Sequence, residues 1–261
     1  MILIDKLAYS SRLRHTSPGL KAAFAAGALV LCVAARSFIV SLCITAVMGC
    51  LTVKIGGTPF RRYSRLLLLP LGFLLISTIS IILHLSEVPS SILSLKLGSR
   101  YLVTDAPSLL YGFRLAATSL SAVSCLYFLT LTTPLADIVA VLRYIRCPAL
   151  VIELMFLMYR FVFVLLELAS SIQRAQQCRL GNKDFRTSLR SIGLMSAILL
   201  QRALSKASTL YDAMEARGYS GQIQVLGRSR PATIREKVWV FLFFFFFTGL
   251  AIICSLYGGI R

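Results

Sequence analysis

Two arginines stand at the ends of two consecutive polar helical stretches, and their side chains are suited to bind carboxylates. Arg179 follows the stretch Ile172 to Cys178, Arg217 follows Leu210 to Ala216, and a glycine comes shortly after each. A guanidinium group offers a planar fork of five N–H donors, which can hold both oxygens of one carboxylate. The neighbouring glycine lets the backbone turn away sharply. The alternative for either arginine alone is a favourable interaction with the helix dipole, worth about 0.3–1 kcal/mol.

The second arginine ends a long amphipathic helix predicted within Ser188 to Gly221. Its apolar residues recur in steps of three and four, which places them on one helix face. They are Leu189, Ile192, Met195, Leu199, Ala203, Ala207, Leu210 and Met214. A second, polar face is formed by Gln201, Ser205, Ser208, Asp212 and Glu215. Gly218 has the place of a helix stop. Thirty helical residues span about 45 Å, and this helix is too polar on one side to cross lipid.

Residues 149–180 predict another long helix, whose relation to the membrane the sequence leaves open. Its first two thirds are apolar enough to enter lipid, yet charges of alternating sign recur every seven residues. These charges are Glu153, Arg160, Glu167 and Arg174. Seven residues rise about 10.5 Å, too far for pairing within the stripe. The stripe either faces polar partners on another helix or lies as a charged face at the membrane surface, so this helix is not counted as a span.

The composition is that of an integral membrane protein. The chain has 261 residues, of which 57% are hydrophobic, and its mean hydropathy is +0.79. Apolar runs of spanning or nearly spanning length occur at 20–35, 38–53, 66–85, 109–131 and 238–257. Residues 54–65 read as a polar turn-forming segment, and residues 86–107 as a loop that could hold one short interfacial helix. We expect an all-α fold of about five transmembrane helices and a domain of amphipathic helices.

This reading divides the chain into four parts. A four-span membrane part covers residues 1–133, and a cytoplasmic or interfacial helical domain covers 134–221. A basic linker at 222–237 leads to a last transmembrane helix at 238–261. If the N-terminus is cytoplasmic, 23 of the 28 basic residues lie inside, four lie outside, and Arg114 lies within the fourth span. That split obeys the positive-inside rule for a multi-pass membrane protein.

Several kinds of chemistry lack their residues in this sequence. The ten acidic residues are scattered, the two histidines are far apart, and no Walker-type phosphate loop occurs. Seven cysteines show no CxxC pair. We therefore expect no catalytic centre, no metal site and no cofactor in this chain. No basic groove with interleaved aromatic residues appears, so nucleic acid is not an expected partner. The net charge of +18 mainly reflects the concentration of basic residues on the cytoplasmic side.

The segment from Gln173 to Gly221 resembles the transmembrane T component of energy-coupling-factor (ECF) transporters, in its cobalt-transport (CbiQ-type) branch. The stretch Tyr211-Asp212-Ala213-Met214-Glu215-Ala216-Arg217-Gly218-Tyr219 carries the likeness. The order of four spans, amphipathic helices and a final span is similar over essentially the whole chain. In that family, two short arginine-centred motifs end the coupling helices and dock into an ATPase pair. They map onto Cys178-Arg179-Leu180 and Ala216-Arg217-Gly218, with Gly181 one place later than in Ala-Arg-Gly.

The resemblance implies a non-catalytic coupling subunit of an ATP-driven importer of cobalt or nickel. It implies a pair of ABC-type ATPase subunits that bind Cys178, Arg179, Leu180 and Gly181 at one helix end. At the other end they bind Ala216, Arg217 and Gly218. It also implies a substrate-binding membrane subunit, the S component of cobalt/nickel type, as a partner within the lipid bilayer. The alternative is a self-contained secondary transporter or channel, and a membrane-bound enzyme is a third reading.

Overall fold

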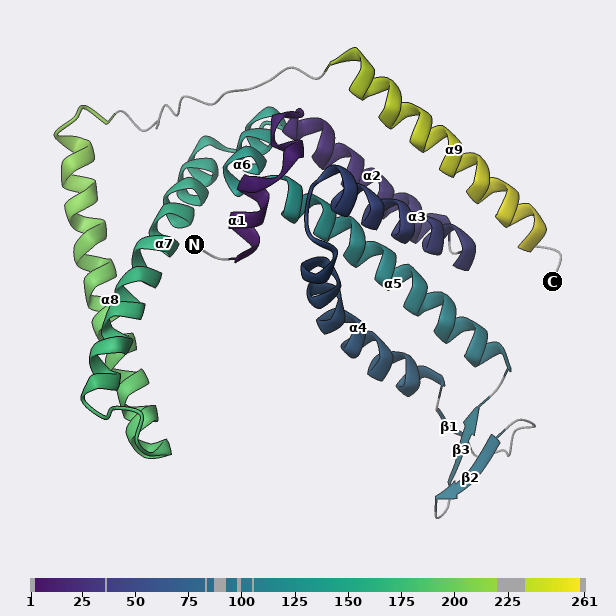
Figure 1. Ribbon diagram of the computed structural model, residues 1–261, viewed down its shortest axis with the longest axis horizontal. Helices are drawn as coiled ribbons and strands as arrows, with labels where there is room; N and C mark the ends of the chain where they lie inside the picture. The colour runs from purple at the N-terminus through teal and green to yellow at the C-terminus, as the bar shows by residue number, and fades with distance from the viewer. Residues whose placement is uncertain are drawn as a thin grey trace. The chain divides into compact units, whose positions relative to one another are not determined.

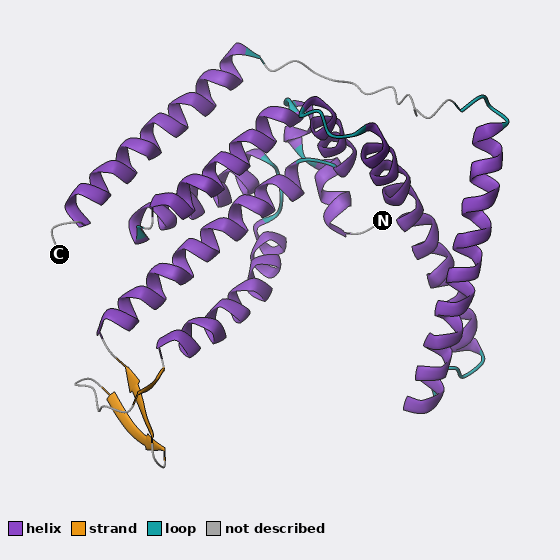
Figure 2. Cartoon of the chain, turned by 180° about the vertical axis from the view of Figure 1, so that it is seen from behind, coloured by secondary structure: helices purple, strands orange, loops and turns teal. Residues whose placement is uncertain are grey.

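The computed structural model is built almost entirely of helices (Figures 1 and 2). It describes residues 3–35, 37–82, 84–86, 93–97, 100–104, 106–219 and 233–258. The chain divides into two compact units. One, here called the membrane unit, comprises residues 2–138 and 229–261, and the other, the hairpin unit, comprises residues 139–228. Most of the predicted basic linker at 222–237 lies outside the described residues.

The predicted long helices are all present, and short helical segments occur in addition at 3–10, 12–15 and 51–55. In the membrane unit they are α1 (Leu3–Ser10), the 3-10 helix η1 (Arg12–His15), α2 (Pro18–Ala35), α3 (Phe38–Cys50), the π-helix η2 (Leu51–Ile55), α4 (Phe60–Ile82), α5 (Ala106–Thr132) and α9 (Ile234–Gly258). Helix α6 (Leu135–Tyr144) leads into the hairpin unit, which holds α7 (Ala149–Cys178) and α8 (Phe185–Glu215). Helix α6 therefore begins the helical domain that was predicted at 134–221.

The first four predicted spans are confirmed as helices with the length and apolarity of membrane spans. They are Pro18–Ala35, Phe38–Ile55, Phe60–Ile82 and Ser108–Thr132. Among the described residues, the fifth helix that meets these measures is α7, at Ala149–Cys178. The fifth span predicted from the sequence is helical as α9, and the side chains of its last residues lie outside the described part. The chain is an all-α, multi-pass integral membrane protein.

The third span differs from its predicted bounds at both ends. It was expected at 66–85, and the helix α4 runs from Phe60 to Ile82. It begins earlier because the Pro59 carbonyl already accepts hydrogen bonds from the N–H groups of Arg62 and Tyr63. Arginine is a good helix former, so the polar turn stops at Pro59 although the next residues are charged. It ends earlier because a β-strand begins at His84.

A small antiparallel sheet lies in the region where a loop with at most one short helix was expected from the sequence. Its strands are β1 (His84–Ser86), β2 (Leu93–Leu97) and β3 (Arg100–Thr104), in the order β1-β3-β2. The sequence of β2 alternates leucine with serine and lysine, which is the two-residue period of a strand. The loop prediction for 86–107 was wrong because it rested on prolines and charged residues as signs of a loop. It did not use the alternation in β2 as a sign of a strand.

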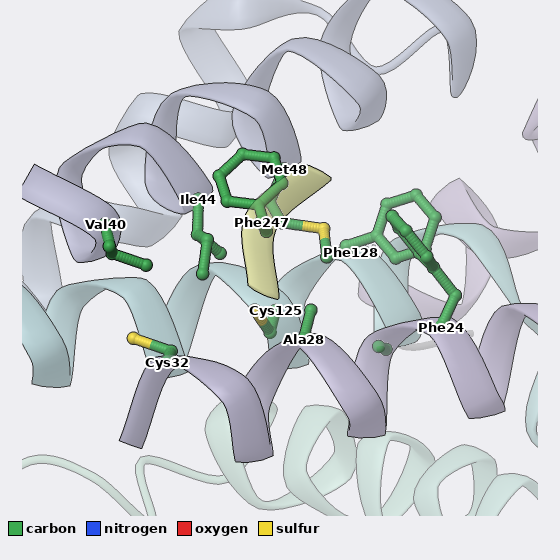
Figure 3. Close-up of a cluster of buried hydrophobic side chains, with 10 residues drawn as sticks. Phe24, Ala28, Cys32, Val40, Ile44, Met48, Cys125, Phe128 and Phe247 are labelled. Atoms are coloured by element: carbon green, nitrogen blue, oxygen red, sulfur yellow. The ribbon is translucent and has the colours of Figure 1, made fainter. Parts of the chain in front are cut away.

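The core of the membrane unit lies where α2, α3 and α5 meet, with α9 against them (Figure 3). The buried residues lie on one face of each helix. They are Phe24, Ala25, Ala28 and Cys32 on α2, Val40, Ile44 and Met48 on α3, and Cys125 and Phe128 on α5. Phe247 of α9 completes the cluster. Small residues on α2 let helices approach closely, as is typical inside membranes.

A buried lysine joins three segments at one end of this unit. Lys21 of α2 is only 4% exposed, and its ammonium group donates to the carbonyls of Leu13 and Thr132, both at 3.0 Å. Thr132 is the last residue of α5, where helix carbonyls lack intrahelical partners and the helix dipole is negative. The lysine therefore satisfies a helix end and fastens η1, α2 and α5 together.

A proline inside α4 leaves one carbonyl without its usual partner. Pro70 lies within the helix and has no N–H, so it cannot donate to the carbonyl of Leu66. The hydroxyl of Tyr127 on α5 donates to that same carbonyl at 3.0 Å. Within lipid an unpaired carbonyl is costly, so this side chain replaces the missing backbone bond and joins α4 to α5.

Replacing Tyr127 with phenylalanine should lower the free energy of unfolding by about 1 kcal/mol, because the Leu66 carbonyl loses its donor. Adding Pro70→Ala should remove this cost, since an alanine N–H at position 70 can bond to Leu66. Denaturant unfolding in detergent, followed by circular dichroism, measures both. Tyr111→Phe is the matched control on α5, where the side chain is 60% exposed. An equal loss in the two Tyr→Phe variants would rule out the assigned role of Tyr127.

Candidate functional site

Helices α7 and α8 form an antiparallel hairpin that carries both predicted arginines, one after each helix (Figure 1). Near the connecting loop, the amide Nε2 of Gln176 donates to the carbonyl of Ser191 at 2.9 Å. At the other end, the hydroxyl of Tyr219 donates to the Glu153 carboxylate at 2.7 Å. The 31 residues of α8 rise about 46 Å. The ends of α7 and α8 therefore lie at opposite ends of the hairpin.

Helix α7 closes through a Schellman motif centred on Arg179. The N–H of Gly181 donates to the Gln176 carbonyl at 2.7 Å, and the N–H of Leu180 donates to the Gln177 carbonyl at 3.1 Å. Leu180 has a φ of 57°, in the left-handed region. These two hydrogen bonds and this φ define the motif and satisfy carbonyls that the helix leaves free. Arg179 occupies the cap position just before the reversal.

Helix α8 closes in the same way around Arg217. The N–H of Tyr219 donates to the Met214 carbonyl at 3.1 Å, and the N–H of Gly218 donates to the Glu215 carbonyl at 2.9 Å. Gly218 has a φ of 75°. Arg217 thus occupies the same cap position as the first arginine, and the backbone leaves the helix by the same turn.

The two closures match residue by residue. Leu180 occupies the place of Gly218, and Gly181 occupies the place of Tyr219. The later position of Gly181 in the first motif therefore does not change how the backbone closes. An L-residue in the left-handed region costs roughly 1–2 kcal/mol, and Leu180 carries this cost where glycine would not.

Both arginine side chains are free to bind another molecule. Arg179 and Arg217 are exposed, and so are Cys178 and Ala216 beside them. In the part of the chain that the structure describes, neither guanidinium group pairs with an acidic side chain or hydrogen bonds to one. An exposed guanidinium fixed at its backbone and unpaired at its tip can accept a carboxylate from a partner.

The two glycines are required for different reasons. A Cβ at Gly181 would lie 2.8 Å from the Gln176 carbonyl oxygen and 2.9 Å from Ser191 Oγ. Ser191 is 9% exposed, and its hydroxyl donates to the Gly181 carbonyl at 2.8 Å. A Cβ at Gly218 would meet nothing within 4 Å, so only its positive φ calls for glycine. Close packing therefore fixes the first turn, and backbone conformation alone shapes the second.

The charged stripe of α7 is only partly explained by a neighbouring helix. Glu153 is 6% exposed and accepts the hydrogen bond from Tyr219, as the first alternative expected. Arg160, Glu167 and Arg174 are exposed, as the second alternative expected. Sequence reasoning did not assign the contact between Glu153 and Tyr219, although Tyr219 stands in the matched motif and Glu153 begins the stripe.

The apolar face predicted for α8 is divided between a groove and an open surface. Ala203 and Ala207 line a groove of about 380 Å³ together with Phe161 and Leu165 of α7. Leu189 and Ile192, on the same predicted face, are exposed. Within the described ranges, no group of three or more His, Cys, Asp or Glu side chains is arranged to hold a metal ion.

Leu180→Gly should protect the end of α7 from hydrogen exchange about fivefold more strongly, because glycine removes a left-handed cost of about 1 kcal/mol. Leu180 is 70% exposed, so little packing is lost with its side chain. Exchange of peptides covering 176–191, measured by mass spectrometry, reports the change. Leu180→Ala is the control, since it keeps a Cβ and should give no gain. Equal protection in the two variants would contradict the assigned strain.

Gly181→Ala should loosen the same turn, because the new methyl group meets the Gln176 carbonyl and the Ser191 hydroxyl. We expect hydrogen exchange of residues 176–191 to become at least tenfold faster, while residues 210–219 keep their protection. Gly193→Ala on α8 is the matched control, because a Cβ there meets nothing within 4 Å. Retained protection in Gly181→Ala would show that the packing at Ser191 does not hold the turn.

Comparison with known proteins agrees with the resemblance seen in the sequence. Residues 10–227 match the family model described as CbiQ, cobalt transport protein. The cobalt transport protein CbiQ of Rhodobacter capsulatus is 34% identical over 229 residues, or 88% of each chain. The CbiQ of Salmonella typhimurium is 26% identical over 230 residues, covering 85% of this chain and 99% of that protein.

A third relative is the putative fused cobalt transport protein CbiMQ of Methanocorpusculum labreanum. It is 29% identical over 248 residues, which cover 95% of this chain and 41% of that protein. The family match covers the first four membrane spans and the whole α7–α8 hairpin with its two arginine-capped ends, and α9 lies beyond it. This chain belongs to the CbiQ family of cobalt transport proteins.

Proposed function

We propose that this chain is the coupling subunit of an ATP-driven importer of the ECF type. Arg179 and Arg217 bind a pair of ABC-type ATPase subunits, one at each end of the hairpin. The observation that carries the proposal is the shared closure of α7 and α8, which puts an exposed arginine at the same cap position of two Schellman motifs. Two equivalent ends suit two equivalent subunits.

The chemistry of the ends supports an acidic groove on each ATPase subunit as the binding site. Each arginine offers five donors in one plane, and a groove carboxylate can accept two of them at once. Cys178 and Gly181 at the first end, and Ala216 and Gly218 at the second, add little bulk beside the charge. Leu180 adds an exposed apolar side chain at the first end. A helix end of this shape can enter a groove while the chain turns away behind it.

The charge distribution supports a cytoplasmic hairpin. If α7 crossed the membrane as a sixth span, the eleven basic residues from Arg179 to Lys237 would lie outside. Fourteen basic residues would then lie outside and eleven inside, which reverses the positive-inside rule. With α7 on the cytoplasmic side, the count is four outside and 23 inside. We therefore place the N-terminus and the α7–α8 hairpin in the cytoplasm, where ATP is available.

The hairpin connects the ATPases to a membrane partner. Closure of the ATPase pair on ATP moves the two helix ends, and helices of about 45 Å carry that motion along their length. Exposed apolar side chains on both helices offer contact to a substrate-binding membrane subunit, the S component. Among them are Leu154, Met158, Leu189, Ile192 and Leu200. The imported ion is cobalt or nickel, and its ligands belong to that partner.

The test replaces both arginines at once. Arg179→Glu with Arg217→Glu should release the ATPase subunits on affinity purification and reduce ATP-dependent cobalt uptake at least tenfold, because a carboxylate repels the acidic groove. The measurement is co-purification from the native membrane, together with uptake of labelled cobalt by whole cells.

The matched control is Arg190→Glu with Arg202→Glu, which makes the same charge change at two exposed arginines within α8. This control should keep both the ATPases and uptake. An intact assembly that still transports after the double change at Arg179 and Arg217 would overturn the proposal. Cobalt transport by the purified chain alone, without ATP, would favour the secondary transporter.

A further inference from the structure

Tyr219 lies two residues after Arg217 and connects the end of α8 to the start of α7. Its hydroxyl donates to Glu153 Oε2 at 2.7 Å, across 66 residues of sequence. Its backbone N–H donates to the Met214 carbonyl as part of the Schellman motif. Tyr219 is thus held by its main chain to α8 and by its side chain to α7, with Arg217 inside the turn between these two anchors.

The acceptor is a buried carboxylate, which makes this hydrogen bond strong. Glu153 is 6% exposed in the second turn of α7. A buried carboxylate needs donors, and a hydrogen bond to an ionised acceptor is roughly twice as strong as one between neutral groups. The hydrogen bond to Glu153 raises the pKa of the Tyr219 phenol above its usual value, because ionisation would put two negative charges together. The hydroxyl therefore stays a donor at neutral pH.

The two ends of the hairpin are fastened by different chemistry. At the Arg179 end, neutral groups join the helices: Gln176 donates to Ser191, and Ser191 donates to Gly181. That end is also closed covalently by a short loop. At the Arg217 end, the end of α8 and the start of α7 are not consecutive in the chain, and a side-chain hydrogen bond to a carboxylate connects them. Removal of the Tyr219 hydroxyl should therefore loosen the second end and leave the first intact.

We propose that Tyr219 and Glu153 are positioning residues for Arg217, and that their hydrogen bond makes the end of α8 move together with the start of α7. A displacement of Arg217 is then transmitted directly to α7, because the hydrogen bond prevents the last turn of α8 from bending on its own. The part of this inference that concerns transport rests on the proposed function. The part that concerns the position of Arg217 rests on the contact alone.

The first experiment tests the contact in the full-length chain in detergent. Tyr219→Phe should speed hydrogen exchange of peptides covering 210–219 about tenfold and leave 176–191 unchanged. Glu153→Leu should do the same, and the double variant should be no faster than either single one. Glu153→Gln, which keeps a side-chain oxygen as acceptor, should retain part of the protection. Tyr211→Phe is the matched control, because Tyr211 lies two turns earlier on α8 and is 61% exposed.

The second experiment measures coupling in the complex with its co-purified ATPases. Tyr219→Phe should keep ATPase binding within twofold, because Arg217 itself is unchanged. Cobalt uptake per ATP hydrolysed should fall about fivefold, and Glu153→Gln should lie between Tyr219→Phe and the natural chain. A merely structural role would lower assembly and uptake together and leave their ratio unchanged.

The outcomes separate the two proposals. If exchange at 210–219 is the same in Tyr219→Phe and Tyr211→Phe, the contact does not hold the end of α8 and this inference fails. If the exchange changes but uptake per ATP does not, its functional part fails and the coupling role of Arg217 stands. If the double arginine variant keeps its ATPases, the proposed function fails, whatever Tyr219 does.

Discussion

The last carbonyl groups of a helix need donors, and the way α7 and α8 meet this need determines where their arginines lie. Both helices use the next two backbone N–H groups, which can reach back only if the residue after the arginine is left-handed. The arginine then stands at the cap, where the chain leaves the helix. Its side chain is exposed because the backbone behind it has already turned away.

This single backbone requirement is met with different residues at the two ends. Gly218 adopts its φ of 75° without steric cost, and Leu180 adopts 57° against a steric preference. At the first end, Gly181 packs closely against Gln176 and Ser191. This packing stabilises the turn in which Leu180 is left-handed. A search for the fixed motif Ala-Arg-Gly would not find the first helix end. The same pair of backbone hydrogen bonds is present at both helix ends.

The sequence predicted the elements well where a continuous apolar run or one helical period extended over a long stretch. The four N-terminal spans stand out as apolar runs, and α7 and α8 stand out as long helical stretches. The two arginines were found because each ends such a helix. Three features were not predicted. The strands at 84–86, 93–97 and 100–104 are short, and the alternation in β2 covers only five residues. The left-handed Leu180 depends on tertiary packing, and the Tyr219–Glu153 contact joins residues 66 positions apart. Single-helix periodicity carries no information about such contacts.

The polar groups of the membrane unit and of the hairpin unit are used differently, which bears on what each unit does. In the membrane unit, Lys21 caps the carbonyl end of α5, and Tyr127 replaces the donor that Pro70 lacks. These polar groups join helices to one another in surroundings where lipid offers no hydrogen bonds. In the hairpin unit, backbone N–H groups satisfy the helix ends, and Arg179 and Arg217 form no ion pair with any residue that the structure describes. The hairpin unit is therefore the part suited to bind partners, because its open guanidinium groups lie at the ends of α7 and α8, two long rigid helices.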